Sequence, residues 1–531
     1  MAGFTAARLW PPPTMGLLAT AIPAVAAGLL ALWFAGKSGP RSHNAWRASL
    51  CLAVGLGGFV LFHIRQPHWH EWSNRPPREI TVSVDIGQVF PPAPQARSIS
   101  GLGTIVAARA LEQHLVGRTV YFSAIRKLSV PARRTGRYII RGVLEPLPHE
   151  QATLTFDAHL ESLGIRLKLS RAQILREAVA PGWFQQFCGR TERRLEGILH
   201  YGLGRHPVVD SLYPAMLLGE KAVLSADQRN AFMRSGTFHI FSVSGLHVGV
   251  IALAFNNLLL LMRVPRRSAA AISLAVLWLY VQVTGGSSPA VRAFLMIASL
   301  LVQQVFRLPG NALAALTAAA LVTLLLEPAQ LFSTGFQMSY TVVVALVVMG
   351  VPLGEKWLLR WRPFALLPRT DRRWWHDAVN WTGRQVIGSG AACWTAFLAS
   401  TPSSIGYFQL LSPGSLIANL VAIPVSSLAI VGGFLSLLCG LAGLLPWCAL
   451  FNSAAAVTII ALDWLVGHGT ILPGVFLPAH FNHSWMTPVA MAALLGTMLA
   501  GLAGRWSRRY GGYWPPALLV TLILAFWTQF G

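Results

Sequence analysis

The chain has 531 residues, of which 54% are hydrophobic and only 11% are charged. A soluble protein of this length carries about a quarter charged residues, so this composition excludes the soluble class and favours a protein that buries much of its surface in lipid. The net charge of +23 does not by itself indicate nucleic-acid binding, because cytoplasmic loops of membrane proteins are rich in Lys and Arg. The five cysteines form no CxxC pair, so neither zinc nor another cofactor is expected.

The first predicted elements are two apolar helices, over 15–34 and 48–65, each long enough to cross a bilayer. The first is too long for a signal-peptide core and lacks a clear small-residue cleavage site, so we expect it to be a retained span. Lys37, Arg41 and Arg47 place the loop between the two helices in the cytoplasm.

Residues 66–205 follow a different pattern, which predicts a separate β-rich domain. Four short segments alternate apolar and polar residues: 79–86, 118–125, 137–144 and 164–169. Short strands at this spacing predict a small β-barrel of the OB type, followed by a helix over 183–203 that carries Arg190, Arg193 and Arg194. Two interpretations stay open: the module binds single-stranded nucleic acid through basic and aromatic side chains, or it only caps the helices.

Residues 206–531 predict a polytopic helical domain. Its apolar segments, of roughly 17–25 residues, lie near 238–262, 268–284, 289–306, 311–326, 338–353, 385–400, 414–442, 447–466, 485–503 and 513–529. Together with the first two helices, in 1–65, they make about twelve spans. The predicted fold class is therefore a polytopic α-helical membrane protein with an inserted extracytoplasmic β-barrel (OB-like) domain.

Basic residues in the short loops predict the orientation. Three further clusters lie within 263–267, 356–384 and 505–509, and alternating spans place all of them in the cytoplasm. Both termini and the module at 66–205 are then expected on the opposite, extracytoplasmic side.

The span at 238–262 carries hydroxyl, imidazole and amide groups, which hydrocarbon leaves without water to bond. Gly245, Gly249 and Asn256 fall on one helical face, where glycine permits the close approach of another helix. For Gly249 and Asn256 we expect a role in helix packing.

Ser244 and His247 lie three residues apart, close to that face. Interhelical hydrogen bonding and a functional role both stay open for them. For His247 we favour a functional role, because ionisable groups inside a membrane commonly mark a functional site.

Arg292 breaks two local rules. It lies in the first turn of a helix that begins at Ser288, where the helix dipole disfavours a cation, and it lies on the expected outer side, against the charge rule. Such a residue predicts an anionic partner, either Asp463 or a phosphate in transit.

Two amides are further candidates. Gln337 opens a span within the polar run STGFQMSY, and Asn419 precedes Pro424, whose ring frees a backbone carbonyl. Broken helices of this kind often line transporter sites, although a simple kink is the alternative.

Catalytic chemistry is weakly indicated, since the chain has no Walker loop and no GxSxG motif. His68, His70 and Glu71 form part of a metal motif, but no second ligand cluster accompanies them, so we expect no metal site and no enzyme. Two other functions stay open: a transporter of a small metabolite, or an intramembrane hydrolase that uses His247 and Ser244.

The run LLGEKAVLSADQRNAFMRSGTFHIFSVSGLHVGVIA at 217–252 resembles the signature of ComEC-type competence proteins, and its SGLHVG core is the most specific part. Later motifs follow in that family's order: SSPAVRAFLM at 287–296, EPAQLFSTGFQMSY at 327–340 and YFQLLSPGSLIANLVAIP at 407–424. The two N-terminal helices followed by an OB-like module also resemble this family, so the resemblance covers nearly the whole chain.

The resemblance implies a channel in a bacterial inner (cytoplasmic) membrane that passes single-stranded DNA into the cytoplasm during natural transformation. The residues that it would place at or near the path are Ser244, Gly245, His247, Arg292, Gln337 and Asn419. It also implies a separate DNA receptor and a separate cytoplasmic translocation motor as partners. Many members carry a metallo-β-lactamase-like domain with a His-rich motif, which does not occur in this sequence, so either a nuclease acts from a separate protein or this member does not degrade the second strand.

Overall fold

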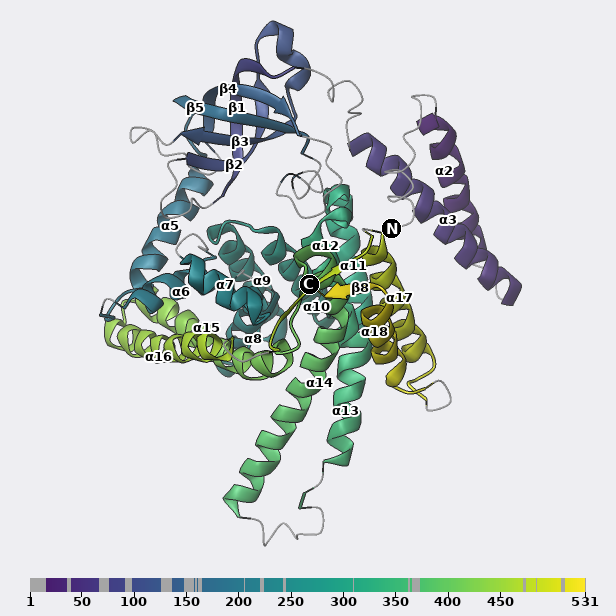
Figure 1. Ribbon diagram of the computed structural model, residues 1–531, viewed down its shortest axis with the longest axis vertical. Helices are drawn as coiled ribbons and strands as arrows, with labels where there is room; N and C mark the ends of the chain where they lie inside the picture. The colour runs from purple at the N-terminus through teal and green to yellow at the C-terminus, as the bar shows by residue number, and fades with distance from the viewer. Residues whose placement is uncertain are drawn as a thin grey trace.

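The computed structural model describes residues 16–35, 40–65, 76–90, 98–125, 136–147, 157, 160, 165–204, 206–219, 224–241, 245–308, 310–361, 363–364, 373–470, 474–483, 485–507 and 511–530. Figure 1 shows a body of helices, a β-barrel at one end of it, and a two-helix hairpin to one side. The barrel and the end of the α13–α14 hairpin lie at opposite ends of the molecule.

Five strands form a closed barrel in the order β1-β2-β3-β5-β4. They are β1 (Arg78–Phe90), β2 (Ser98–Ala107), β3 (Thr119–Ile125), β4 (Arg137–Pro146) and β5 (Leu167–Val179). All neighbours are antiparallel except β3 and β5, which are parallel. Every second residue of β2 points inward, so the strands enclose an apolar core. This confirms the predicted β-barrel.

The sequence pattern did not predict β2, because its glycines lower strand propensity. Gly103 occupies an inward position where an added Cβ would lie 2.3 Å from the Val84 side chain. A glycine is therefore required where β2 crosses close to β1.

Two of the basic side chains on the barrel are neutralised by acidic partners. Arg137 pairs with Asp85 at 2.8 Å, and Arg141 pairs with Glu79 at 2.6 Å. The hydrogen bond from Arg141 lowers the pKa of Glu79, so this carboxylate remains charged at neutral pH. The positive charge that the barrel offers to a ligand must therefore come from other residues.

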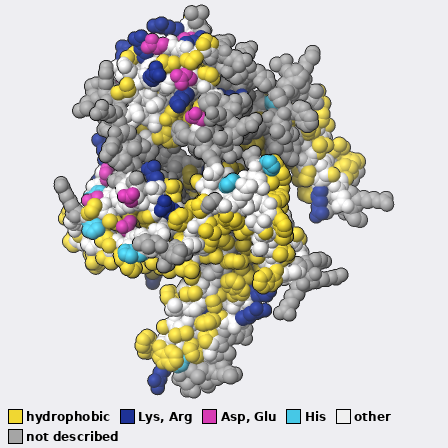
Figure 2. Space-filling model, in the orientation of Figure 1, with side chains coloured by type: hydrophobic (Ala, Val, Ile, Leu, Met, Phe, Trp, Pro, Cys, Tyr) yellow, Lys and Arg dark blue, Asp and Glu magenta, His cyan; other side chains and the backbone are white. Residues whose placement is uncertain are grey.

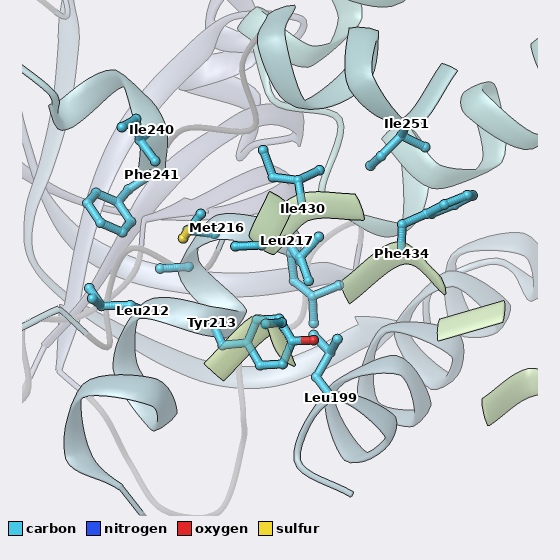
Figure 3. Close-up of a cluster of buried hydrophobic side chains, with 14 of the residues drawn as sticks. Leu199, Leu212, Tyr213, Met216, Leu217, Ile240, Phe241, Ile251, Ile430 and Phe434 are labelled. Atoms are coloured by element: carbon cyan, nitrogen blue, oxygen red, sulfur yellow. The ribbon is translucent and has the colours of Figure 1, made fainter. Parts of the chain in front are cut away.

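Helix α5 (Trp183–Leu199) joins the barrel to the body and is followed by α6 (Pro207–Leu217) and α7 (Ala226–Arg234). From Ser211 to Leu217 every residue of α6 is buried. Figure 3 shows Leu212, Tyr213, Met216 and Leu217 of this helix together with side chains of α8 and α15 in one apolar cluster. No element was predicted here, because eleven residues with internal proline are too short for a span.

The helical body contains the remaining helices. They are α8 (Gly245–Leu261), α9 (Arg266–Val283), α10 (Ser288–Val305), α11 (Ala312–Leu326), α12 (Thr334–Ala345), α13 (Val351–Arg360), α14 (Trp374–Phe408), α15 (Ser415–Leu441), α16 (Leu445–Gly469), α17 (Met486–Ala503) and α18 (Trp514–Phe526). The N-terminal hairpin consists of α2 (Gly16–Ala35) and α3 (Pro40–Arg65). Each predicted span thus coincides with helix over most of its length.

Six helical segments within the described residues are long and apolar enough to cross a membrane: Asn44–Ile64, Ser288–Val305, Thr334–Arg360, Ser415–Leu441, Leu445–Gly469 and Met486–Ala503. Four others are apolar but shorter: Ala21–Ala35, His247–Leu261, Ala312–Leu326 and Trp514–Phe526. The structure therefore supports a membrane protein, but it does not support the predicted number of about twelve spans. Figure 2 agrees, since hydrophobic side chains cover much of the body, while charged ones lie mainly on the barrel, on the side of the body below it and at the lower end of the molecule.

Several helix bounds differ from the sequence-based expectation. The segment expected as one span at 238–262 contains a short 3-10 helix, η3 (Phe238–Phe241), and then α8. The span expected at 338–353 is longer, because a π-helical segment, η5 (Leu346–Gly350), joins α12 to α13. Helix α14 extends well beyond the expected 385–400 at both ends. In Figure 1 the hairpin α15–α16 runs across α13–α14 rather than along it, so the two hairpins do not share one axis.

The other connections are local. A short sheet of β6 (Leu410–Leu411), β7 (Leu477–Phe481) and β8 (Thr528–Phe530) brings the end of the chain beside the end of α14. The N-terminal hairpin contacts the body through α3, where Phe62 lies edge-on to Phe332, with ring centroids 5.8 Å apart. Phe332 belongs to η4 (Pro328–Phe332), which precedes α12.

Candidate functional site

The predicted path residues that the structure describes lie within the first five residues of four helices. Gly245 and His247 open α8, Arg292 lies in α10, Gln337 in α12 and Asn419 in α15. Helix α8 contacts both α10 and α15, and α10 contacts α12. The N-terminal ends of helices carry partial positive charge and N–H groups without helical partners. Ser244, the remaining predicted path residue, lies outside the described residues.

Arg292 is buried with only 2% of its surface exposed. Its Nη1 donates to Ser288 Oγ at 2.6 Å, and its Nη2 donates to the carbonyl of Gly335 at 2.9 Å. Its Nε has no hydrogen-bond partner among the described residues. None of the ion pairs between described residues includes Arg292. Burying a cation without a directly paired carboxylate costs on the order of several kcal/mol, which marks this position as unusual.

A chain of hydrogen bonds links this guanidinium indirectly to a carboxylate. Ser288 Oγ accepts from Arg292 and donates to Gln330 Oε1 at 3.1 Å. Gln330 Nε2 in turn donates to Glu327 Oε2 at 2.7 Å. Two neutral dipoles, the hydroxyl of Ser288 and the amide of Gln330, therefore separate the charges of Arg292 and Glu327. The charges polarise this series of hydrogen bonds, but the cation has no contact ion pair.

The expected pairing of Arg292 with Asp463 is wrong. Asp463 lies on α16, where it interacts with Gln228 and His206. Charge complementarity in the sequence suggested the pair, but the fold brings α16 against α6 and α7 instead. A phosphate in transit, the other partner that the sequence left open for Arg292, stays a prediction.

The side chain of Gln337 connects two helices. Its Nε2 donates to the Leu331 carbonyl at 3.1 Å, and its Oε1 accepts from the hydroxyl of Tyr407 on α14. Gln337 lies two residues after Gly335, whose carbonyl accepts from Arg292. The amide therefore connects α12 to α14 two residues beyond the carbonyl that Arg292 contacts.

Gly245, His247 and Asn419 complete the group. An added Cβ at Gly245 would lie 3.9 Å from the Cβ of Ala293, so the start of α8 lies against α10 beside Arg292. The side chain of His247 is fully buried. Asn419 is half-buried, and its Oδ1 has no hydrogen-bond partner among the described residues.

The helix-packing roles expected for Gly249 and Asn256 stay predictions. An added Cβ at Gly249 would meet no heavy atom within 4 Å, and within the described ranges Asn256 has no hydrogen bond to another helix. Helix α8 packs instead through buried larger side chains, Val248 and Ile251 among them. Gly245, on the same face, does lie close to α10, so the spacing of small residues does not by itself identify which of them meets a neighbouring helix.

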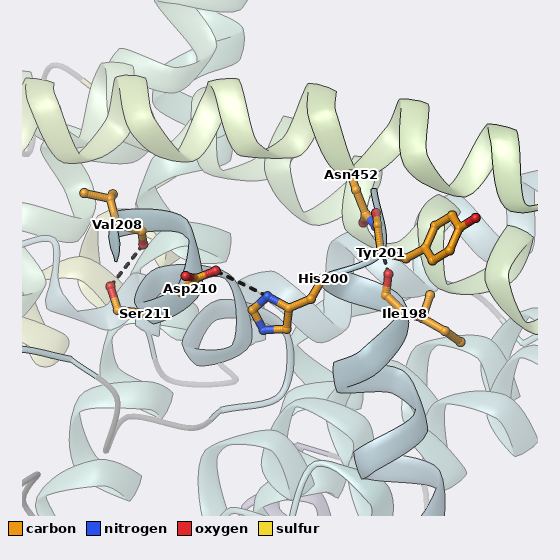
Figure 4. A network of polar contacts seen from close by, with 7 residues as sticks. All are labelled: Ile198, His200, Tyr201, Val208, Asp210, Ser211 and Asn452. Atoms are coloured by element: carbon orange, nitrogen blue, oxygen red, sulfur yellow. Dashed lines mark hydrogen bonds and ion pairs between the residues drawn. The ribbon is translucent and has the colours of Figure 1, made fainter. Parts of the chain in front are cut away.

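A second polar site, which sequence reasoning missed, joins α5 and α6 to α16. Asn452 is fully buried, and its Nδ2 donates to the carbonyls of Ile198 at 2.8 Å and Tyr201 at 2.9 Å. Its Oδ1 accepts from the hydroxyl of Tyr213 at 2.9 Å. Figure 4 shows Asn452 reaching from its helix to this turn. The sequence feature that could have revealed this site is the amide of Asn452 within the apolar segment at 447–466.

Close backbone approach reinforces this junction. An added Cβ at Gly440 on α15 would lie 2.4 Å from Ile198, and one at Gly202, whose φ is +77°, would lie 2.6 Å from Ala449 on α16. Beside the junction, His200 Nδ1 lies 3.4 Å from Asp210 Oδ1 (Figure 4). The end of α5 is thus held against the α15–α16 hairpin from two sides.

Within the ranges that the structure describes, no group of three or more His, Cys, Asp or Glu could hold a metal ion. The partial metal motif at His68, His70 and Glu71 lies outside those ranges.

Removing the hydroxyl in Tyr407→Phe should lower the stability of the purified protein, because it breaks the bond to Gln337 and leaves a half-buried amide oxygen unsatisfied. We expect a loss of about 1 kcal/mol, seen as a lower melting temperature in detergent. Tyr201→Phe is the matched control, since Tyr201 is 43% exposed. Equal melting temperatures for the two variants would show that the bond to Gln337 contributes nothing.

Comparisons with known proteins bear on the same part of the chain. A family model described as "Competence protein" matches residues 216–507, which is more than half of the chain and includes every described path residue. The protein "ComE operon protein 3" of Bacillus subtilis (strain 168) is 28% identical over 142 residues, which cover 27% of this chain and 18% of that relative. The match thus spans less than a fifth of the relative. No solved structure matches the chain. The chain belongs to the Competence protein family.

Proposed function

We propose that this protein is a channel that passes single-stranded DNA through the inner membrane during natural transformation. The observation that carries the proposal is the group of polar side chains at the N-terminal ends of α8, α10, α12 and α15. One of these side chains is Arg292, a buried arginine without a contact carboxylate among the described residues. Family membership supplies the biological setting.

The physical demand on such a channel is specific. Each phosphate of DNA is charged, and a bare charge is costly in hydrocarbon, so the strand needs cations and dipoles along its path. Binding must also remain weak at each step, or the strand would stall. A single guanidinium combined with helix N-termini, amides and an imidazole offers phosphates attraction without a tight, multidentate pocket.

The barrel fits an entry role. Its five strands close in the order expected for an OB-type barrel, a fold that commonly binds oligonucleotides. With Arg137 and Arg141 paired to carboxylates, its available cations include Lys168, Arg171 and Arg176 on β5. We place the barrel and both termini on the extracytoplasmic side, and the basic α13–α14 loop in the cytoplasm.

In this proposal the chain conducts the strand and performs no catalysis itself. A separate receptor delivers DNA, a cytoplasmic motor pulls the strand, and any nuclease acts from another protein. The bilayer and the single strand are the partners of this chain.

The test is deletion of the gene in a transformable host, followed by scoring of labelled DNA in the cytoplasm. We expect DNA to bind at the cell surface but not to enter, and entry to return when the intact gene is restored. Normal entry of labelled DNA into the deletion strain would refute the channel. A deletion strain that loses only the uptake of a small metabolite would refute it as well.

A further inference from the structure

We propose that the exposed face of α5 is a second binding surface for single-stranded nucleic acid, which guides the strand from the barrel to the helical body. This inference rests on the proposed channel function. The surface consists of Trp183, Phe187, Arg190 and Arg194, here called the α5 stripe.

Helical periodicity places the four residues together. Their spacing of 4, 3 and 4 residues puts them on one side of α5, each above the next. All four are exposed, Trp183 by 81% and Phe187 by 45%. An exposed indole and an exposed phenyl ring above two guanidinium groups are unusual on a helix that has a well-packed opposite side.

The apolar and acidic residues of α5 lie on other sides of the helix than the stripe. Its buried residues are Cys188, Leu195 and Leu199, which pack into the body. Its two acidic residues, Glu192 and Glu196, each come two positions after an arginine of the stripe. Two positions correspond to just over half a helical turn. The carboxylates therefore face away from the stripe and leave its positive charge uncancelled.

The helix forms a rigid support. At its start the ring of Phe184 stacks on Trp278 of α9, with centroids 5.4 Å apart. At its end Ile198 fits against Gly440, and its carbonyl accepts from Asn452. Helix α5 is thus held at both ends by the body. Binding to the stripe would therefore not require the helix to become ordered first.

Two exposed arginines of the barrel precede the stripe in the chain. Helix α5 follows β5 after three residues, and β5 carries Arg171 and Arg176, both exposed. Figure 1 shows α5 bridging the space between the barrel and the body. A strand leaving β5 would therefore meet arginine and aromatic side chains along its route.

The chemistry matches a single strand better than a duplex. Bases stack on aromatic rings only when they are unpaired, while arginine contacts the backbone phosphates. A membrane surface also accepts aromatic and arginine side chains on a helix, so it is the competing occupant that the experiment must separate. The continuity with the cations of β5 favours nucleic acid.

The test uses the full-length protein in lipid nanodiscs and a fluorescent oligothymidylate about 20 nucleotides long. We expect Trp183→Ala to weaken binding about tenfold, since stacking on one base is lost. We expect Arg190→Gln and Arg194→Gln each to make the dependence of log affinity on log salt shallower by about 0.7, the value for one phosphate contact on a single strand. Trp514→Ala, at another exposed indole (79%), and Arg266→Gln, at another exposed arginine, should change neither quantity.

Each outcome decides a separate point. If stripe variants bind like the wild type, and brominated lipids quench the part of the fluorescence that Trp183→Ala removes, the stripe faces the membrane and this inference fails. If the two control variants weaken binding equally, the binding is nonspecific and the inference fails as well. If the wild-type protein binds no single strand at all, the channel proposal itself loses its support.

Discussion

Replacing Arg292 by glutamine should reduce the entry of labelled DNA about ten- to hundredfold while leaving the amount of protein in the membrane close to normal. The range corresponds to the loss of one charge-assisted contact, about 1.5–3 kcal/mol, with each passing phosphate. Arg292 is the buried cation of the candidate path, and no described carboxylate pairs with it directly. Glutamine keeps some hydrogen-bonding capacity but removes the charge.

Arg292→Lys separates charge from geometry. Lysine keeps the cation but cannot donate from two fixed nitrogens to Ser288 and Gly335 at once. If attraction of phosphate is what matters, the lysine variant retains most of the uptake; equal defects would mean that the guanidinium holds α10 to α12. Arg267→Gln serves as control, because Arg267 is exposed at the start of α9. Wild-type uptake by Arg292→Gln would remove Arg292 from the path.

The sequence predicted those features that depend on local pattern. Alternation along β1, β3 and β4 was enough to predict the barrel, and apolar length located the helices. The missed elements were those in which tertiary contact overrides local preference. Strand β2 contains Gly103 because Val84 leaves no space for a side chain, and α6 is stable at eleven residues because its neighbours bury it.

In the candidate site, too, the features that depend on local sequence were predictable and those that depend on tertiary contact were not. Arg292 was identifiable because it breaks rules about dipole and charge that a single sequence can show. Its contact with Gly335 was not identifiable, since Gly335 lies on α12 and the contact between α10 and α12 depends on the whole fold, whereas Ser288 lies four residues before Arg292 on the same helix. Gly249 shows the converse, because small-residue spacing indicates a possible helix contact without showing that a partner approaches.

Asn452→Leu should destabilise the protein by about 3 kcal/mol or more. Leucine fills nearly the same volume, so the effect isolates hydrogen bonding from cavity formation. It leaves the buried hydroxyl of Tyr213 and the carbonyl of Tyr201 without this partner, at about 1–3 kcal/mol for each group, and it removes one donor from the carbonyl of Ile198, which still accepts from the N–H of Tyr201. The measurement is a denaturation curve of the purified protein, with Ser453→Ala as the matched control on the exposed side of the same helix.

Tyr213→Phe tests whether the junction acts as a unit. Alone it removes one donor and should cost about 1 kcal/mol, but in the Asn452→Leu background it should cost little, because its acceptor is already gone. Additive losses would show that the two side chains act independently and that Asn452 does not organise the junction. The consequence for function follows from position: the turn that Asn452 holds ends α5, and α5 is the described helix that ties the barrel to the body. A loosened turn would let the barrel move relative to the helices, so DNA entry should fall even where the folded protein persists.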